Sequence, residues 1–179
     1  MQGIIFNLLE EAVTLEHGPT AWDDVLSFAH SDGVFTSLGT YSDEQFRALI
    51  GATSAHLNRP ANEVLCWFGR AAMPMLIERY PRLVSAHGSV RSLLLSVNQV
   101  VHREVLKIYP GSVLPLLEVR EEQDCSLLVV YRSHRQLCAL AQGFAEGAAE
   151  HYGESLGFRH LKCMQQGDDH CLIRVAIGS

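Results

Sequence analysis

The hydrophobic pattern of the chain changes its period once, close to Pro110. Before this point apolar residues recur at helical spacing, as in residues 2–16, and after it short apolar runs are separated by polar turns. Helices followed by strands predict an α+β fold with a four-stranded antiparallel sheet. We expect one domain over residues 1–179, with a helical N-terminal subdomain of about residues 1–60 and an α/β subdomain of about residues 61–179.

Five helices are expected in the first part of the chain, over residues 2–16, 20–30, 42–57, 59–81 and 88–111. Ser42 is a suitable N-cap for the third helix, with Gln45 at its third position. Pro74 should kink or break the fourth helix, because proline lacks an N–H donor and clashes with the preceding turn. The last helix is expected to be continuous and to end at Pro110-Gly111.

The second part of the chain predicts four strands and one helix. Strands are expected over residues 112–120, 126–133, 158–165 and 171–178, and a helix over residues 134–152. The last two strands should be joined by a turn around Gly167.

Charge and cysteine usage exclude several classes of protein. The net charge is −6 and no cluster of Lys or Arg is visible along the chain, so no nucleic acid is expected as a partner. No segment approaches the roughly 18 uninterrupted apolar residues of a membrane span, and the N-terminus lacks the basic region of a signal peptide. Five cysteines without a secretion signal favour a reducing cytoplasm, where thiols serve metals or redox chemistry.

The stretch LLVVYRSHRQLC, residues 127–138, runs from a buried strand directly into polar residues. If the strand continues, Tyr131, Ser133 and Arg135 alternate along it and point to the same face. Three donors directed at one place, with no acceptor nearby in the sequence, indicate an anion from outside the chain.

His102 lies in the last of the expected N-terminal helices. A lone helical histidine is more often a satisfied, partly buried side chain than a ligand. Its position about thirty residues before the three donors favours a ligand, since a haem needs one axial imidazole and partners for two propionates. Arg135 suits a carboxylate through its forked donors. The chain has no C-x-x-C-H motif, which excludes covalent c-type attachment.

With these residues the chain resembles the H-NOX family, the haem nitric oxide/oxygen-binding domains related to the haem domain of soluble guanylate cyclase. The resemblance rests on the opening MQGIIFNLLEEAV, on His102, on Pro115 in SVLPLLEV and on YRSHR, which matches the family's Y-x-S-x-R. It covers essentially the whole chain and is to the bacterial stand-alone type. It implies haem b between the two subdomains.

The resemblance implies a role for each of these residues. His102 would be the axial ligand of the haem iron. The propionates would be bound by Tyr131, Ser133 and Arg135. Ile5 and Pro115 would press on the macrocycle from opposite sides and hold it distorted. Without the resemblance, Pro115 would be read as a proline at a strand edge.

The resemblance also bears on the choice of gas. A distal hydrogen-bond donor stabilises bound oxygen, whereas nitric oxide binds ferrous iron tightly without one. In oxygen-binding members a tyrosine lies nine residues after the motif tyrosine, and here that position is Leu140. The other side chains expected at the distal face also lack a donor, namely Ile5, Leu9, Met73, Pro74 and Met75. We therefore expect a nitric oxide sensor, with carbon monoxide as a weaker ligand.

A second constellation lies in HLKCMQQGDDHC, residues 160–171. Cys163 and Cys171 are symmetric about Gly167 and should face each other across a hairpin, where they could chelate a metal or form a disulfide. A tetrahedral Cys₃His zinc site of the structural type would consist of Cys138, His160, Cys163 and Cys171. A bulge or strand end is needed for the histidine and the first hairpin cysteine to share a face, and His170 is an alternative ligand. Some bacterial H-NOX proteins look similar here and hold zinc.

Three functions are compatible with these observations. The first is a haem-based sensor that regulates a separate protein, for which the resemblance suggests a histidine kinase or a cyclic-di-GMP enzyme acting in trans. The second is a zinc/thiol redox sensor that uses the C-terminal cysteine and histidine cluster, since thiolates can oxidise and release metal. The third, an enzyme, is not expected, because no Ser–His–acid set or phosphate-binding loop is visible. The length leaves no room for a kinase or cyclase domain.

Overall fold

The computed structural model describes residues 1–178, apart from the side chain of Leu83. Its helices are α1 (Gly3–His17), α2 (Pro19–Ala29), α3 (Asp43–Leu57), α4 (Ala61–Arg79), α5 (Arg82–Ser85), α6 (Val90–Ser96), α7 (Val101–Ile108) and α8 (Cys138–His151). Its strands are β1 (Leu116–Glu121), β2 (Leu127–Arg132), β3 (Ser155–Lys162) and β4 (Cys171–Gly178), with a 3₁₀ turn η1 (Met164–Gln166) before β4. The α+β prediction is confirmed.

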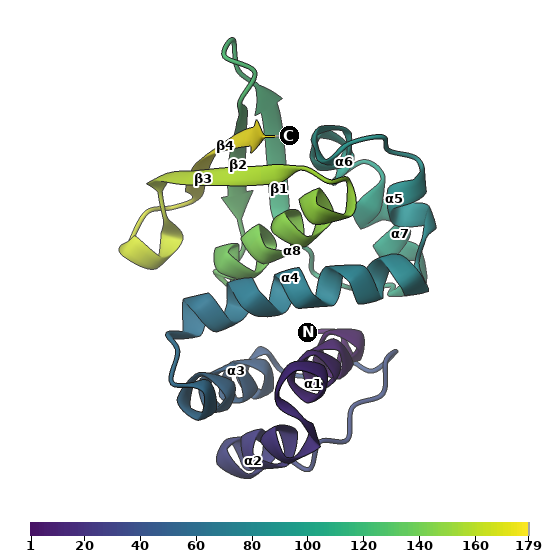
Figure 1. Ribbon diagram of the computed structural model, residues 1–179, viewed down its shortest axis with the longest axis vertical. Helices are drawn as coiled ribbons and strands as arrows, with labels where there is room; N and C mark the ends of the chain where they lie inside the picture. The colour runs from purple at the N-terminus through teal and green to yellow at the C-terminus, as the bar shows by residue number, and fades with distance from the viewer. Residues whose placement is uncertain (179) are drawn as a thin grey trace.

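Two parts are stacked along the long axis of the protein (Figure 1). Helices α1, α2 and α3 lie at one end, the sheet and α8 lie at the other, and α4 crosses between them. The N-terminal core forms because α1 presents an apolar face that buries Phe6, Leu8 and Leu9. No helix within residues 1–178 combines the length and the apolar composition that crossing a membrane requires.

The helix cap that the sequence predicts at the start of α3 is present in the structure. Ser42 Oγ accepts from the backbone N–H of Gln45 at 3.1 Å, and Gln45 Oε1 accepts from the backbone N–H of Ser42 at 3.1 Å. This reciprocal capping box satisfies two donors at the start of α3 that the helix itself leaves free. It also places Asp43 at the first position of the helix.

Pro74 is expected to kink or break α4, but the helix continues through this proline, which excludes the break. Pro74 is exposed on the outer side of the helix, while the inner side packs closely on α8. Glycines allow this close approach: a Cβ atom at Gly143 of α8 would lie only 2.0 Å from the carbonyl oxygen of Cys66 in α4. Tight packing on α8 therefore keeps α4 helical at Pro74, although this residue has no backbone N–H to donate.

The expectation of one continuous helix over residues 88–111 is also wrong. Two short helices, α6 and α7, flank a turn at residues 97–100, and the backbone N–H of His102 bonds to the carbonyl of Val97, five residues back. The side chain of Asn98 in this turn donates to the carbonyl of Leu117 in β1. Side-chain bonds to distant backbone of this kind compete with helix formation.

The sheet has the strand order β1-β2-β4-β3 with antiparallel neighbours throughout. Its inner face packs against α8 through side chains such as Leu127, Ile173 and Val175. Strand β2 ends at Arg132, and residues 133–137 form a turn, so the expectation that three alternating donors share one strand face is wrong. Only Tyr131 belongs to the strand.

Candidate functional site

His102 is the half-buried histidine of α7, and one neighbour orients its ring. Nδ1 lies 3.0 Å from Oδ1 of Asn98, whose amide nitrogen already donates to the carbonyl of Leu117. The amide oxygen therefore faces the ring, so Nδ1 carries the proton and Nε2 is the nitrogen left for coordination. Burial lowers the pKa of His102, which favours the neutral imidazole that a metal ligand requires. Sequence reasoning missed Asn98 as a partner of the ring.

Tyr131, Ser133 and Arg135 lie together at the end of β2, in a turn that folds back on itself. The Tyr131 hydroxyl is buried and accepts from the backbone N–H of Leu137 at 3.1 Å. Burial raises the pKa of Tyr131, so the phenol stays protonated and can donate. The Ser133 hydroxyl accepts from the backbone N–H of Arg135 at 3.2 Å.

Arg135 is tied to Asp43, a residue that sequence reasoning did not select. Nε of Arg135 donates to Oδ1 of Asp43 at 2.8 Å, and one terminal nitrogen donates to the carbonyl of Val113. The N-terminal ammonium of Met1 also reaches Oδ1, at 3.1 Å, and His134 Nε2 lies 3.2 Å from Oδ2. Partial burial acts to raise the pKa of Asp43, but the bonds from Arg135 and the N-terminus outweigh it and lower the pKa to about 2.

This donor set fits a haem. A guanidinium has five N–H groups, and Asp43 and Val113 take two of those on Arg135, which leaves donors for a carboxylate. Nε2 of His102 makes no hydrogen bond with residues 1–178 and is free to bind iron. The residues would thus supply one axial nitrogen and a cationic partner for propionates, which are the two requirements of the group.

The side chains expected near the macrocycle separate into two groups. Ile5, Leu9, Met75 and Leu140 all belong to the main hydrophobic core or pack against it. Met73 packs instead in another cluster with Val84 and Ala148, and Pro74 is exposed, so these two do not belong to the main core. Pro115 is half-buried and directly precedes β1.

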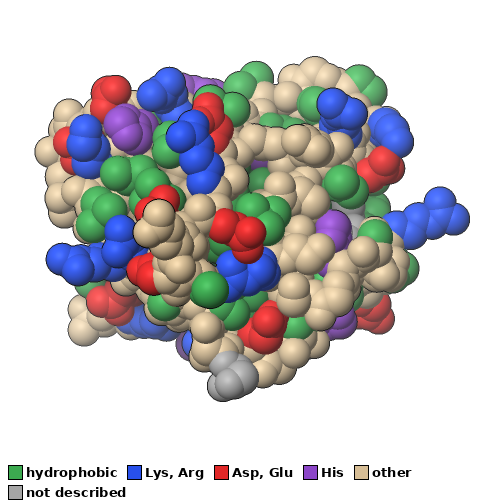
Figure 2. Space-filling model, turned by 90° about the horizontal axis from the view of Figure 1, so that it is seen from above, with side chains coloured by type: hydrophobic (Ala, Val, Ile, Leu, Met, Phe, Trp, Pro, Cys, Tyr) green, Lys and Arg blue, Asp and Glu red, His purple; other side chains and the backbone are tan. Residues whose placement is uncertain are grey.

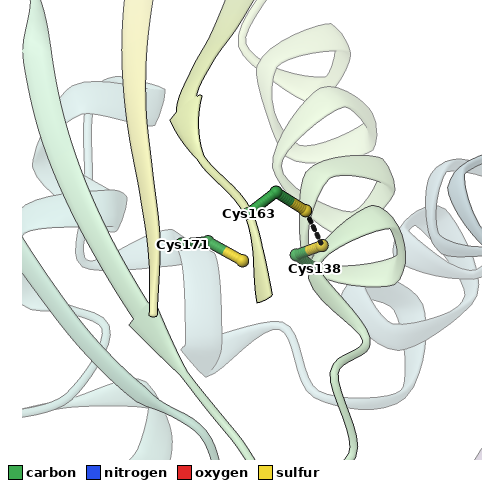
Figure 3. Close-up of side chains that lie close together, drawn as sticks. All are labelled: Cys138, Cys163 and Cys171. Carbon is green, nitrogen blue, oxygen red and sulfur yellow. Dashed lines mark hydrogen bonds between the residues drawn. The ribbon is translucent and has the colours of Figure 1, made fainter. Parts of the chain in front are cut away.

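Three cysteines meet at the other candidate site (Figure 3). Cys138 starts α8, while Cys163 and Cys171 face each other at the end of the β3–β4 hairpin, as the sequence predicts, and all three side chains are buried. Their sulfur atoms all lie within 4.8 Å of one another. Burial and the neighbouring thiols raise the pKa of Cys138 to about 12, so a cation is needed for these groups to ionise together.

One sulfur–sulfur distance shows that two of these thiols are not joined by a disulfide. Sγ of Cys138 lies 3.9 Å from Sγ of Cys163. The S–S edge of a tetrahedral zinc thiolate site is about 3.8 Å, given Zn–S bonds of about 2.3 Å, whereas a disulfide bond is about 2.05 Å long. Within residues 1–178 the thiols are therefore unbonded, and the separation of Cys138 and Cys163 matches both a zinc site and the contact of two free thiols.

His160 lies outside this group of three sulfurs. His160 pairs with Ile173 on the inner face of the sheet, and the bulge between His160 and Lys162 brings Cys163 to this same face, as a Cys₃His set requires. The ring is exposed, however, and Nε2 lies 3.3 Å from Oε1 of Gln142 on α8. The alternative ligand, His170, is bonded to Asp169 through Nδ1 at 2.6 Å.

Comparison with known proteins places these sites in a family. Residues 2–160 match the family model described as haem-NO-binding. The chain belongs to the H-NOX family. Domains of this family bind haem and are gas sensors rather than enzymes.

Solved H-NOX structures share the whole fold. A crystal structure of an H-NOX protein from S. oneidensis in the Fe(II)NO ligation state is 30% identical, with complete coverage of both chains and a TM-score of 0.94. An NMR structure of the S. oneidensis domain in the Fe(II)CO state is 29% identical, covers 100% of this chain and 99% of that one, and has a TM-score of 0.90. The Fe(II) unliganded H-NOX protein of K. algicida is 25% identical, with 100% and 97% coverage and a TM-score of 0.89.

Proposed function

We propose that this protein is a haem-based sensor of nitric oxide. The observation that carries the proposal is the state of His102: a half-buried imidazole whose Nδ1 is occupied by Asn98 and whose Nε2 has no partner within residues 1–178. The similar S. oneidensis proteins have been solved in Fe(II)NO and Fe(II)CO ligation states. When bound, haem b would supply the ferrous iron at which a diatomic gas binds.

Each residue of the site has a proposed role. His102 would coordinate the iron through Nε2, while Asn98 holds the ring in the required tautomer. The propionates would be bound by Tyr131, Ser133 and Arg135. Ile5 and Pro115 would contact the two faces of the macrocycle. We also propose that the helical part up to about residue 60 forms one subdomain and residues 61–179 the other, with haem between them.

The apolar core supports nitric oxide over oxygen. Leu140 is buried and Ile5 packs in the same core, and neither side chain can donate a hydrogen bond to bound oxygen. Every tyrosine hydroxyl already has a partner: these residues are Tyr41, Tyr80, Tyr109, Tyr131 and Tyr152. None of the core side chains assigned to the distal face, namely Ile5, Leu9, Met75 and Leu140, carries a hydrogen-bond donor.

Absorption spectra of the haem-loaded protein under each gas test this proposal. Nitric oxide and carbon monoxide should each change the spectrum of the ferrous protein, and oxygen should give no stable new spectrum. A stable spectrum under oxygen would contradict the assignment. Leu140→Tyr should introduce measurable oxygen affinity, whereas Leu140→Met, which conserves volume and adds no donor, should not.

The signal is proposed to pass to a separate protein. The candidates that the family resemblance implies are a histidine kinase or a cyclic-di-GMP enzyme in trans, within the cytoplasm, with the chain itself having no catalytic activity. Co-purification with each candidate, followed by its activity with and without nitric oxide, would test this. Equal activity in both states would contradict regulation by gas.

A second candidate function rests on the three-cysteine cluster. We propose that it binds one zinc ion per chain through Cys138, Cys163 and Cys171, with His160 as the fourth ligand once its ring leaves Gln142. Oxidation of the thiolates would release the metal, which would make the cluster a redox sensor. Metal analysis of protein purified under reducing conditions should give about one zinc per chain. Absence of zinc, with a disulfide after oxidation, would contradict this.

A further inference from the structure

The outer face of the sheet collects basic residues that lie far apart in the sequence. Side chains alternate along each strand, so the residues that do not face α8 share the opposite face. The strand register places five basic residues on it: Arg120 of β1, Arg132 of β2, Arg174 of β4, and Arg159 and Lys162 of β3. All five are exposed.

The outer face is positively charged, whereas the net charge of the whole chain is negative. Five of the fourteen basic residues are gathered here, in a chain whose net charge is −6. The strands place a single acidic residue on the same face, Glu118, which lies 3.5 Å from Arg120. Within residues 1–178, Arg132, Arg159 and Lys162 form no ion pair, and Arg174 has only a distant contact to Asp124, at 3.7 Å.

Two of these arginines oppose each other directly. Arg159 and Arg174 are cross-strand partners in the β3–β4 register. Like charges at directly opposite positions of an antiparallel pair destabilise a sheet. The arrangement gains nothing for folding, and an external anion placed between the two guanidinium groups would relieve the repulsion.

The floor between the basic side chains is apolar. Val130 and Leu172 are cross-strand partners on this face, Leu128 is next to them, and all three are half-buried. Leu116 opposes Arg132 and leaves 44% of its surface exposed. Figure 2, which looks onto the sheet end of the protein, shows basic, acidic and hydrophobic side chains close together at this end. A free anion or a flexible polyanion would leave these apolar side chains exposed to water.

We propose that the outer sheet face is a docking surface for an acidic segment of a partner protein, in which carboxylates alternate with apolar side chains. Carboxylates match the forked donors of arginine, and the apolar side chains would cover Val130 and Leu172. A nucleic acid is disfavoured because its phosphate backbone has no apolar groups that would cover Val130 and Leu172. The proposal rests on the sensor function and gives the chemistry of its partner.

The position of this surface suits a sensor. Arg132 lies on the outer face directly between Tyr131 and Ser133, which belong to the candidate haem site. A partner bound here would contact the strand that carries the propionate-binding turn. Four strands spaced about 4.8 Å apart, with about 20–25 Å of length each, offer roughly 300–400 Å². Stable complexes bury about 800 Å² per partner, so binding should be transient and sensitive to salt.

Titration with a defined peptide tests the proposal. The probe is a short labelled peptide in which pairs of glutamates alternate with single leucines, added to the haem-loaded protein and followed by fluorescence anisotropy. Binding should weaken about tenfold or more between about 50 and about 300 mM salt. Arg159→Glu with Arg174→Glu should weaken it about tenfold or more. The matched control is Arg47→Glu with Arg82→Glu, which makes the same change in net charge at exposed sites on α3 and α5.

The outcomes separate this proposal from the sensor proposal and from other partners. If the double charge reversal disturbs the fold, as judged by circular dichroism, Arg159→Gln with Arg174→Gln replaces it. Equal peptide affinity in the sheet variant and the control would overturn the proposal, as would tighter binding to phosphatidylserine vesicles or to single-stranded DNA. Gas spectra of the same samples report on the haem site alone, so a failure of that site is recognised separately.

Discussion

The two groups of candidate ligands occupy opposite surroundings. Cys138, Cys163 and Cys171 are buried where a hairpin meets the start of α8, within a hydrophobic cluster. His102 lies on α7, a two-turn helix with no fully buried residue. Part of what holds that helix is polar: Asn98 bonds the ring of His102, and the hydroxyl of Tyr109 at the end of α7 meets that of Tyr80 at 3.1 Å. The rest is apolar, from the half-buried Val101 and Val105 and the buried ring of Tyr109.

This difference indicates which site can move. Displacing α7 breaks a few hydrogen bonds, each with a net value of about 0.5–1.5 kcal/mol, and uncovers two half-buried valines and one tyrosine ring. Displacing a cysteine opens the core of the sheet, where cavities and unsatisfied groups cost several times more. The histidine is therefore placed where a ligand can shift its segment, and the cysteines are placed where a metal would stabilise the fold.

Replacement of His102 should have the largest effect on function and little effect on folding. His102→Gly should abolish normal haem retention, and added imidazole should restore it by filling the vacated position. Haem absorbance per protein measures retention, and circular dichroism measures folding. His30→Gly is the matched control, since His30 already has the left-handed conformation that glycine favours at a helix end. An unchanged ferrous spectrum in His102→Gly without imidazole would exclude this residue as the ligand.

Replacement of a buried cysteine should have the opposite pattern, with a large effect on folding. Cys171→Ser places a hydroxyl at a fully buried position and removes one proposed zinc ligand, so it should lower the free energy of unfolding by about 2–4 kcal/mol and abolish the proposed zinc binding. Cys125→Ser, at the exposed tip of the β1–β2 hairpin, should change stability by less than about 0.5 kcal/mol. Equal denaturation midpoints for the two variants would show that the cluster does not stabilise the fold.

Replacement of Arg135 tests the polar contacts of the candidate haem site. Arg135→Ala should weaken haem binding by about one to two decades, because a charge-assisted hydrogen bond is worth about 1.5–3 kcal/mol. The protein should stay folded, and Arg82→Ala at an exposed site on α5 should bind haem normally. Titration of apo-protein with haem measures both affinities, and unaltered affinity in Arg135→Ala would remove this residue from the site.

Asp43 predicts a pH dependence in the acid range. Its folded-state pKa of about 2 lies below the ordinary value of 3.8, so the stability that it contributes is present above pH 4 and is lost as the pH falls towards 2. Asp43→Asn should remove this part of the acid transition and cost about 1 kcal/mol at neutral pH. Urea titrations of both proteins between these pH values measure the difference, and parallel curves would contradict the ion-pair assignment.

Asn98→Ala should have the smallest effect on stability, about 1 kcal/mol or less, because the turn around it is partly exposed. The ring of His102 would lose the acceptor that selects one tautomer. Nitrogen NMR shifts of the apo-protein should then show a mixture of the two neutral forms. A single, unchanged tautomer would mean that Asn98 does not orient the ring.

Local sequence signals determined much of the fold. The capping box at Ser42 and Gln45 acts within one helical turn, so its residues alone specify the start of α3. The symmetry of Cys163 and Cys171 about Gly167 likewise brings two thiols together within one hairpin. Leu140 could be placed in the core from the family motif, because helix α8 follows that motif directly.

Contacts between distant segments were decided only by the tertiary structure. Asp43 and Arg135 are 92 residues apart, and no pattern along the chain links them. The break before α7 depends on the bond from Asn98 to Leu117, which exists only once β1 is in place. The basic residues of the outer sheet face never form a run in the sequence, because side-chain alternation separates them along each strand. The pairing register then aligns them across the four strands. Short-range propensity is carried by neighbouring residues, whereas register and long-range charge pairing arise only when the chain closes its long loops.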